Sequence, residues 1–296
     1  MDLVLKVSKV PMQGETIISD YFAVNAGGKG ANQAVACSKL GGKVSMIGVV
    51  GNDLYGQMLK ESLENSCVDI SGVQTSDKAL TGTAIVLIEN NDNRIIVNQG
   101  ANAIQNIDFI TNFLKTKARK DDILLSQLEI PVNIVLESLK VAKRIGMYTI
   151  LNPAPVTKLP KEIYHYLDML IPNEHEVEQL SGIAPNSEEN LNDIRDFFAK
   201  ENIKELIITL GADGGCYIDF KKIMKFPAYQ TAAIDTTAAG DTFIGAYVAQ
   251  IASGASVMKA IDFASLASSI TVSRIGAQQA IPTLSELTTY INDASK

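Results

Sequence analysis

The apolar residues of this chain alternate between short continuous runs and longer amphipathic stretches from about residue 43 onward. Short apolar runs bounded by polar residues predict buried strands, and apolar positions three or four residues apart predict helices. Strands and helices that alternate in this way are typical of βαβ units, which build a mostly parallel sheet. We therefore predict an α/β fold whose doubly wound, mostly parallel sheet is flanked by helices.

The predicted elements of this body are short strands with longer helices between them. The predicted strands are Val44–Val49, Ile123–Leu128, Tyr148–Leu151, Met169–Ile171 and Leu206–Leu210. The predicted helices are Ala31–Leu40, Tyr55–Asn65, Val132–Arg144, Glu188–Lys200, Asp241–Ala252 and Val257–Arg274.

Two regions depart from this rhythm and predict β-structure with turns, namely residues 2–25 and 83–98. The second contains a run of turn-forming residues, which predicts a hairpin. We expect one domain of 296 residues in which these regions form a small β lid over a cleft at the carboxyl ends of the strands. The predicted turn comprises Asn90, Asn91, Asp92 and Asn93.

Composition narrows the class of protein. With 46% hydrophobic and 20% charged residues, the chain can bury a large core. A net charge of −7 and scattered basic residues make nucleic acid an unexpected partner.

Polar residues interrupt the longest uncharged stretch, Thr242–Met258, and neither a leader nor a membrane span is visible. Three cysteines far apart in sequence suit a reducing compartment, so we expect a soluble cytoplasmic protein.

The segment Asp235–Asp241 carries the most specific chemical signal. Small residues lead into the apolar helix after it, so bare amides at the helix start could hold an anion. Asp241 could be a helix cap. It could instead take a proton from an attacking hydroxyl, while the adjacent amides stabilise charge on a transferred phosphoryl group. The two acids and the small residues before one helix favour the second interpretation.

The segment Gly27–Asn32 also places glycines before a predicted helix, where the backbone could approach a polar ligand. It matches neither common phosphate-loop template, because Lys29 is followed by Gly30 and Gln33 occupies the place of a third glycine. A structural turn therefore remains the alternative.

Two further segments each allow a structural and a functional interpretation. Asn173 and Glu176, three residues apart after a strand, could order water around Mg²⁺ or could simply cap a helix. The glycine-rich turn Thr209–Gly215 could cradle nucleotide phosphates or connect a hairpin. The chain contains only two histidines, His165 and His175, which leaves few candidates for a histidine-rich metal site or a Ser-His-Asp triad.

In this order and spacing, these segments resemble the ribokinase-like carbohydrate kinase family over essentially the whole chain. The resemblance implies ATP-dependent phosphorylation of D-ribose at its 5-hydroxyl, with Asp241 as the general base and Gly240 at the anion hole. The residues that carry the resemblance are Gly27–Ala34, Gln127–Glu129, Asn152–Pro155, Pro172–Glu174, Asp235–Phe243 and Arg274–Gln278.

The resemblance also assigns binding residues, with ATP, Mg²⁺ and K⁺ as cofactors. For the sugar it implies Asp2, Gly28, Lys29, Gly30, Ala31, Asn32, Glu129 and Asp241. For the nucleotide it implies Asn173, Thr209, Leu210, Gly211, Ala212, Asp213, Gly214, Gly240 and Ser265, with Glu176 associated with Mg²⁺. For a monovalent cation it implies Asp235, Thr237, Thr271, Arg274, Gly276 and Ala280, although the family carries Ser at the position of Ala280.

Members of the family also have a buried strand, ending in Asn, before the position that matches Met1, so we expect that strand to be missing here. Other family substrates, such as 2-deoxyribose or fructose, remain alternatives, as does an inactive sugar-binding remnant. A nicotinamide-dependent dehydrogenase is disfavoured, because no complete dinucleotide fingerprint follows a strand. An exposed lid sheet with open edges also predicts a homodimer through the lid, a prediction carried mostly by the resemblance.

Overall fold

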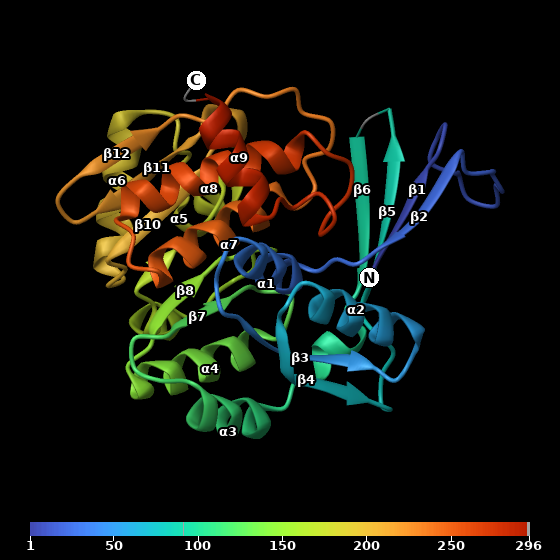
Figure 1. Cartoon of the computed structure of the whole chain (residues 1–296), viewed down its shortest axis with the longest axis horizontal. Helices are drawn as coiled ribbons and strands as arrows, with labels where there is room; N and C mark the ends of the chain where they lie inside the picture. Colours follow the sequence, from blue (N-terminus) through green and yellow to red (C-terminus); the bar gives the residue numbers. More distant parts are fainter. Residues whose placement is uncertain (91, 295–296) are drawn as a thin grey trace.

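The computed structural model describes residues 1–90 and 92–294, which form an α/β body and a smaller β-sheet set to one side of it (Figure 1). The main sheet of the body has the order β12-β11-β10-β9-β8-β7, and its members from β7 to β10 run parallel. At the other end of the sheet, β11 runs antiparallel to β10, and β12 runs antiparallel to β11. The strands are β7 (Ile123–Ser126), β8 (Tyr148–Leu151), β9 (Met169–Leu170), β10 (Glu205–Thr209), β11 (Gly215–Asp219) and β12 (Ile223–Phe226).

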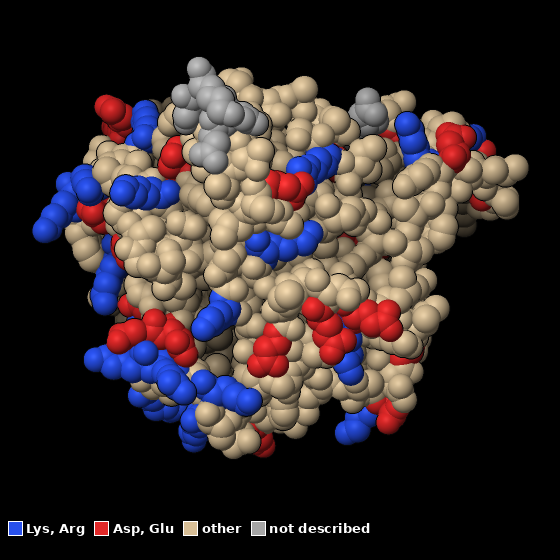
Figure 2. All heavy atoms as spheres, viewed as in Figure 1, with Lys and Arg blue, Asp and Glu red and all other residues tan. Residues whose placement is uncertain are grey.

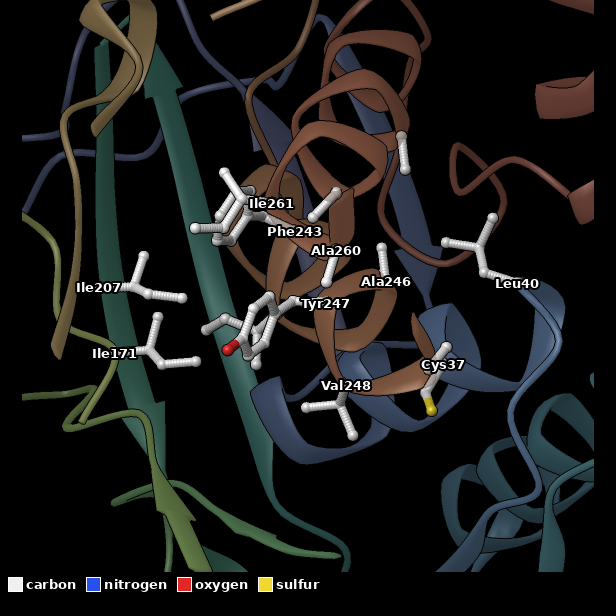
Figure 3. Close-up of a cluster of buried hydrophobic side chains, with 14 of the residues drawn as sticks. Cys37, Leu40, Ile171, Ile207, Phe243, Ala246, Tyr247, Val248, Ala260 and Ile261 are labelled. Carbon is white, nitrogen blue, oxygen red and sulfur yellow. The ribbon is translucent and has the colours of Figure 1, made fainter. Parts of the chain in front are cut away.

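Helices cover both faces of this sheet, which confirms the predicted doubly wound fold. Successive strand residues point to opposite faces, so Ile150 and Leu151 belong to different apolar cores. One core involves α1 (Lys29–Lys39), α7 (Ala239–Ala252), α8 (Val257–Val272) and α9 (Leu284–Ala294); the other involves α4 (Val132–Ile145), α5 (Glu174–Ser181) and α6 (Glu188–Lys200). In the first core, Tyr247 of α7 faces Ile171 and Ile207 (Figure 3).

A second pair of parallel strands, β3 (Ser45–Gly51) and β4 (Asp69–Ser76), is joined through α2 (Leu54–Asn65). Within residues 1–90 and 92–294, β3 and β7 each pair with a neighbouring strand on one side only. The residues of β7 are accordingly only half-buried, whereas most of β8 is buried. The expectation that a family strand before the position of Met1 is missing is not tested by these contacts and stays a prediction.

The smaller sheet, here called the lid, has the order β2-β1-β5-β6. Its strands are β1 (Asp2–Lys6), β2 (Tyr21–Asn25), β5 (Thr83–Glu89) and β6 (Asp92–Asn98). β1 pairs antiparallel with β2 and parallel with β5, while β5 and β6 are antiparallel. Both predicted β regions therefore join one sheet; Asn91 of the predicted turn lies outside the described residues.

The predicted helices and body strands are confirmed to within a few residues. Four elements lacked a clear signal: β4, β12, α9 and α3 (Ile107–Lys117). In β4, Gly72 and alternating exposed polar residues break the apolar run on which the prediction depends. No helix in the described part of the chain is long and apolar enough to cross a membrane.

Candidate active site

Asp241 lies in the first turn of α7, and its side chain is turned into the protein. One carboxylate oxygen accepts a hydrogen bond from Asn32 Nδ2 at 3.0 Å, and the other accepts one from Gln33 Nε2 at 2.9 Å. The residue before the helix is Ala238, in a left-handed conformation and with no side-chain cap bond. The capping interpretation of Asp241 therefore gives way to an acid held between two amide side chains.

Close contact between α1 and α7 brings these donors to Asp241. A Cβ atom added to Gly245 would lie 2.6 Å from the Cβ of Ala36 and 2.6 Å from the carbonyl oxygen of Gln33, so only glycine permits this approach. Asn32 and Gln33 sit at the start of α1, opposite the start of α7. The helix crossing thus aligns the two amides with the acid.

A chain of buried amides continues from Gln33 towards the ends of the parallel strands. Gln33 Nε2 also donates to Asn152 Oδ1 at 3.1 Å, and Gln127 donates to the side-chain oxygen of Gln33. Gln278 supports Asn32 in the same way, at 3.2 Å. No role was predicted from the sequence for these amides, which are Gln33, Gln127, Asn152 and Gln278. The available signal was an amide in an otherwise apolar position at a strand end or helix start.

The glycine segment before α1 forms a turn against two more acids. Gly28 precedes the helix with φ of 96°, a conformation that side chains rarely adopt. The backbone N–H of Lys29 donates to Glu129 Oε2 at 2.7 Å. Gly27 packs directly against the carboxylate of Asp2 from the lid. The segment thus brings lid and body acids together at the start of α1, and the choice between a structural turn and a ligand-binding role stays open.

The acids around this turn affect one another electrostatically. Burial raises the pKa of Asp2, and the charge of Asp241 raises it further, against the opposing effect of Lys29. Burial likewise raises the pKa of Glu129, opposed by the N–H and the charge of Lys29. Asp2, Glu129 and Asp241 therefore converge on one polar region with a lysine beside it, where their oxygens can accept bonds from several hydroxyls.

The start of α7 offers free backbone amides next to Asp241. Gly240 is exposed, and a Cβ atom added to it would meet nothing within 4 Å. The first N–H groups of a helix have no partner within the helix and carry partial positive charge. An anion can therefore approach Gly240 close to the acid.

Asn173 and Glu176 form a capping box at the start of α5. The Asn173 side chain accepts from the N–H of Glu176 at 2.8 Å, and Glu176 accepts from the N–H of Asn173 at 2.9 Å. Burial raises the pKa of Glu176, opposed by that backbone bond. The cap is confirmed, and the association with Mg²⁺ stays a prediction.

The glycine-rich turn after β10 connects an antiparallel hairpin through a short 3₁₀ turn, Gly211–Asp213. Thr209 at its start forms a bridge with Asn173, so the two segments lie side by side. Ser265 is buried on α8, whose Ser268 donates to the carbonyl of Ala239 at 2.9 Å. The hairpin is confirmed, and a nucleotide role for these residues stays a prediction.

The residues expected around a monovalent cation come from two adjoining segments. The carboxylate of Asp235 accepts from the N–H of Thr237 and from that of Gly276, both at 2.9 Å. Thr271 bonds to Thr242 on α7 at 3.1 Å. These contacts place the loop after α8 beside the start of α7. The remaining members are Arg274, whose side chain pairs with Glu286, and the buried Ala280.

The residues that the structure describes contain no group of three or more acidic, histidine or cysteine side chains that could hold a metal ion. The face drawn in Figure 2 carries acidic and basic side chains in mixed groups, with basic ones most numerous at the lower left.

Comparison with known proteins places this geometry in a family. Residues 1–284 match the model of the pfkB family carbohydrate kinases. The chain is 36% identical over 290 residues to ribokinase of Staphylococcus aureus (strain COL), covering 97% of this chain and 95% of that protein. It is 38% identical over 300 residues to ribokinase of Schizosaccharomyces pombe (strain 972), covering 97% and 93%.

The fold agrees with the sequence match. The structure of Arabidopsis thaliana ribokinase complexed with ribose and ATP superposes with a TM-score of 0.88 and 28% identity, covering 97% of this chain and 94% of that one. The acid at a helix start, the glycine turn and the lid are thus found in a chain that matches carbohydrate kinases along almost its whole length. The chain belongs to the pfkB family of carbohydrate kinases and is itself a carbohydrate kinase.

Proposed function

We propose that this carbohydrate kinase transfers the γ-phosphoryl group of ATP to the 5-hydroxyl of D-ribose, with Asp241 as the general base. The observation that carries the proposal is the position of Asp241, a buried acid directly beside the free amides at the start of α7. Relatives named ribokinase, and the relative complexed with ribose and ATP, favour this sugar and this nucleotide.

The reaction needs a base and a site for negative charge within reach of each other. Asp241 accepts the proton of the sugar hydroxyl, whose oxygen forms a bond to the γ-phosphorus while the bond to the β–γ bridging oxygen breaks and ADP leaves. The amides at Gly240 and the following residue of α7 stabilise the negative charge on the transferred group. Asn32 and Gln33 keep the carboxylate turned towards the sugar side.

Sugar binding is assigned to the converging polar groups at the turn before α1. Asp2 and Glu129 accept hydrogen bonds from sugar hydroxyls, and the segment Gly28–Asn32 presents backbone groups and the Asn32 amide. A site built from many hydrogen-bonding groups rejects a sugar that leaves one unpaired. This arrangement supports a choice among sugars by their hydroxyl pattern.

Nucleotide and ions are assigned to the adjoining segments. The glycines of the β10–β11 turn suit close approach by phosphates, and Asn173 with Glu176 suits water around Mg²⁺, which neutralises charge on the phosphates. Asp235 and the carbonyls of the 271–276 loop supply the oxygens that a K⁺ ion prefers. Ala280 offers no side-chain oxygen. The residues present fit both ions.

The test is turnover of ATP with D-ribose, Mg²⁺ and K⁺, with the product located by phosphorus NMR. We expect ribose 5-phosphate and one ADP per sugar, with lower kcat/KM for 2-deoxyribose and fructose. Preference for either competing sugar would replace the proposed substrate within the same family, and no turnover of any of them would support the inactive remnant.

We also propose that two copies pair through their lids. β6 exposes Ile95, Ile96 and Val97, and β2 exposes Phe22, so the lid carries apolar side chains at both of its edge strands. Open sheet edges with apolar side chains favour pairing with another copy. Light scattering should give twice the chain mass, and a monomer at micromolar concentration would contradict the pairing.

A further inference from the structure

Thr81 lies at the root of the lid, just before β5, and is 3% exposed. Its hydroxyl accepts a hydrogen bond from the N–H of Gly51 at 2.9 Å and donates to Asp53 Oδ1 at 2.7 Å. Its backbone N–H donates to Asp53 Oδ2 at 2.8 Å. A single threonine and a single carboxylate therefore join the end of β3, the start of α2 and the first residues of the lid; this set of bonds is called the clasp below.

Asp53 is fixed from the body side as well. It is the N-cap of α2, and Oδ1 accepts from the N–H of Gly56 at 2.8 Å. Burial by itself would raise the pKa of Asp53, but the bonds from Thr81 and Gly56 outweigh it and hold the pKa below its ordinary value. The clasp is thus built on an ionised carboxylate at neutral pH, and hydrogen bonds to a charged group are stronger than neutral ones.

The backbone around the clasp is packed too tightly for side chains. A Cβ atom on Gly51 would lie 2.6 Å from Asp53 Oδ2, and one on Gly82 would lie 2.7 Å from the carbonyl oxygen of Gln99. Gly100, with φ of 48°, would place a Cβ atom 2.9 Å from the N of Gly82. The connections to β5 and from β6 both pass this point, so the lid leaves the body through one close-packed joint.

The clasp is linked to the sugar region through β1. Directly after Thr81, the carbonyl of Gly82 accepts from the nitrogen of Met1 at 2.9 Å, and the N–H of Ala84 donates to the carbonyl of Met1 at 2.9 Å. Asp2 stands opposite Ala84 in the ladder. The position of the Asp2 carboxylate against Gly27 therefore depends on where the clasp holds the start of β5.

We propose that Thr81 and Asp53 are positioning residues for sugar binding, which fix the root of the lid so that Asp2 faces the body acids across the cleft. The proposal rests on the proposed sugar kinase function and deepens it. Both residues bond to the root of the lid, and their effect reaches the sugar region through β1 and Asp2. The clasp should consequently affect the binding of the sugar and leave the binding of ATP alone.

The test uses Thr81→Val, which keeps the side-chain shape but removes the hydroxyl. We expect the KM for D-ribose to rise about tenfold, with kcat and the KM for ATP within about twofold of the parent chain. Thr81→Ser, which restores the hydroxyl, should recover the KM. Hydrogen exchange should show a faster-exchanging amide at Gly51 and faster-exchanging β1 and β5 in Thr81→Val alone.

Thr149→Val is the matched control. Thr149 is also a buried threonine bonded to an aspartate: its hydroxyl donates to the carbonyl of Tyr166 at 2.7 Å and contacts Asp168 at 3.1 Å, far from the lid. The Thr149→Val variant should have a lower melting temperature than the parent chain and an unchanged KM for ribose. If both threonine variants raised the KM equally, or if Thr81→Ser failed to recover it, the clasp would be merely structural.

Two results separate this proposal from the function on which it rests. If the parent chain does not phosphorylate ribose, the proposed function fails, and the clasp is then judged by hydrogen exchange alone: unchanged lid exchange in Thr81→Val overturns it. If Thr81→Val does not fold, Asp53→Asn, which keeps an oxygen to cap α2, takes its place with the same expected rise in KM, and an unchanged KM in that variant overturns the proposal.

Discussion

The two ends of the main sheet both bury carboxylates, but they surround them differently. At the carboxyl end, both oxygens of Asp241 are held by neutral amides. At the amino end, Asp168 forms ion pairs with Lys143 and Lys204 and accepts from the N–H of Thr149 at 2.9 Å. Amide donors orient a carboxylate and leave its charge in place, whereas a lysine neutralises it.

The second acid at the amino end is held by neutral donors, but it has no open helix start beside it in the described part of the chain. Glu205 accepts hydrogen bonds from the hydroxyls of Tyr148 and Tyr217, one on each oxygen. Burial and the bond to Glu205 raise the pKa of both tyrosines, so the phenols remain donors at neutral pH. Burial of an acid therefore does not by itself mark an active site. Orientation by neutral donors beside an open helix start is the distinguishing feature.

The largest expected effect comes from replacing the oriented acid. Asp241→Asn should lower kcat about 10³- to 10⁴-fold with little change in the KM for ATP, because it removes the base and keeps the shape of the side chain. Asp168→Asn, the same substitution at the other end of the sheet, is the control and should leave kcat unchanged. Equal losses of kcat in the two variants would show that neither acid is special to the reaction.

The next effect concerns the amides that orient Asp241. Gln33→Met keeps the length of the side chain but removes the donors to Asp241 and Asn152, so we expect kcat to fall about 10- to 100-fold through a misoriented base. Steady-state kinetics with ribose and ATP measures this fall in kcat. Asn152→Ala removes the support behind Gln33 and the bond to the carbonyl of Ile171 but leaves the donor to Asp241 in place, so it should give a smaller loss of kcat. A larger loss would contradict this order.

At the amino end, the expected effect falls on stability. Burial alone would raise the pKa of Asp168, but the bonds from Lys143 and Thr149 hold this pKa below its ordinary value. A group whose pKa is lowered on folding stabilises the protein above its unfolded pKa, and the stabilisation is lost as the pH falls through the folded value. Asp168→Asn should therefore cost about 1 to 3 kcal/mol at pH 7. In urea unfolding, that difference should shrink below about pH 4; a difference independent of pH would exclude the charge as its cause.

The sequence predicted the elements of the body well because their apolar positions repeat strongly, as in β8 and α6, whose bounds agree with the structure. It also indicated Asp241 and the glycine segment as candidates, since small residues before an apolar helix have few structural explanations, and the structure brings both to one polar region; their roles stay predictions. It could not identify the amide network, because Gln33 and Gln127 are 94 residues apart in sequence. The crossing of α1 and α7 at Gly245 brings Gln33 to Asp241, and the ends of β7 and β8 bring Gln127 and Asn152 to Gln33. No local pattern encodes these approaches.

The smallest expected effect tests whether the phenols serve only stability. Tyr148→Phe removes one donor from Glu205 but leaves the bond from Tyr217. Since a typical hydrogen bond contributes about 0.5 to 1.5 kcal/mol, unfolding in urea should shift by an amount in that range. Both kcat and the KM for ribose should stay within about twofold of the parent chain, because the proposed base and sugar-binding groups lie at the opposite end of the strands. A change in kcat at constant stability would mean that the two ends of the sheet are coupled, and the contrast between a structural end and a chemical end would then fail.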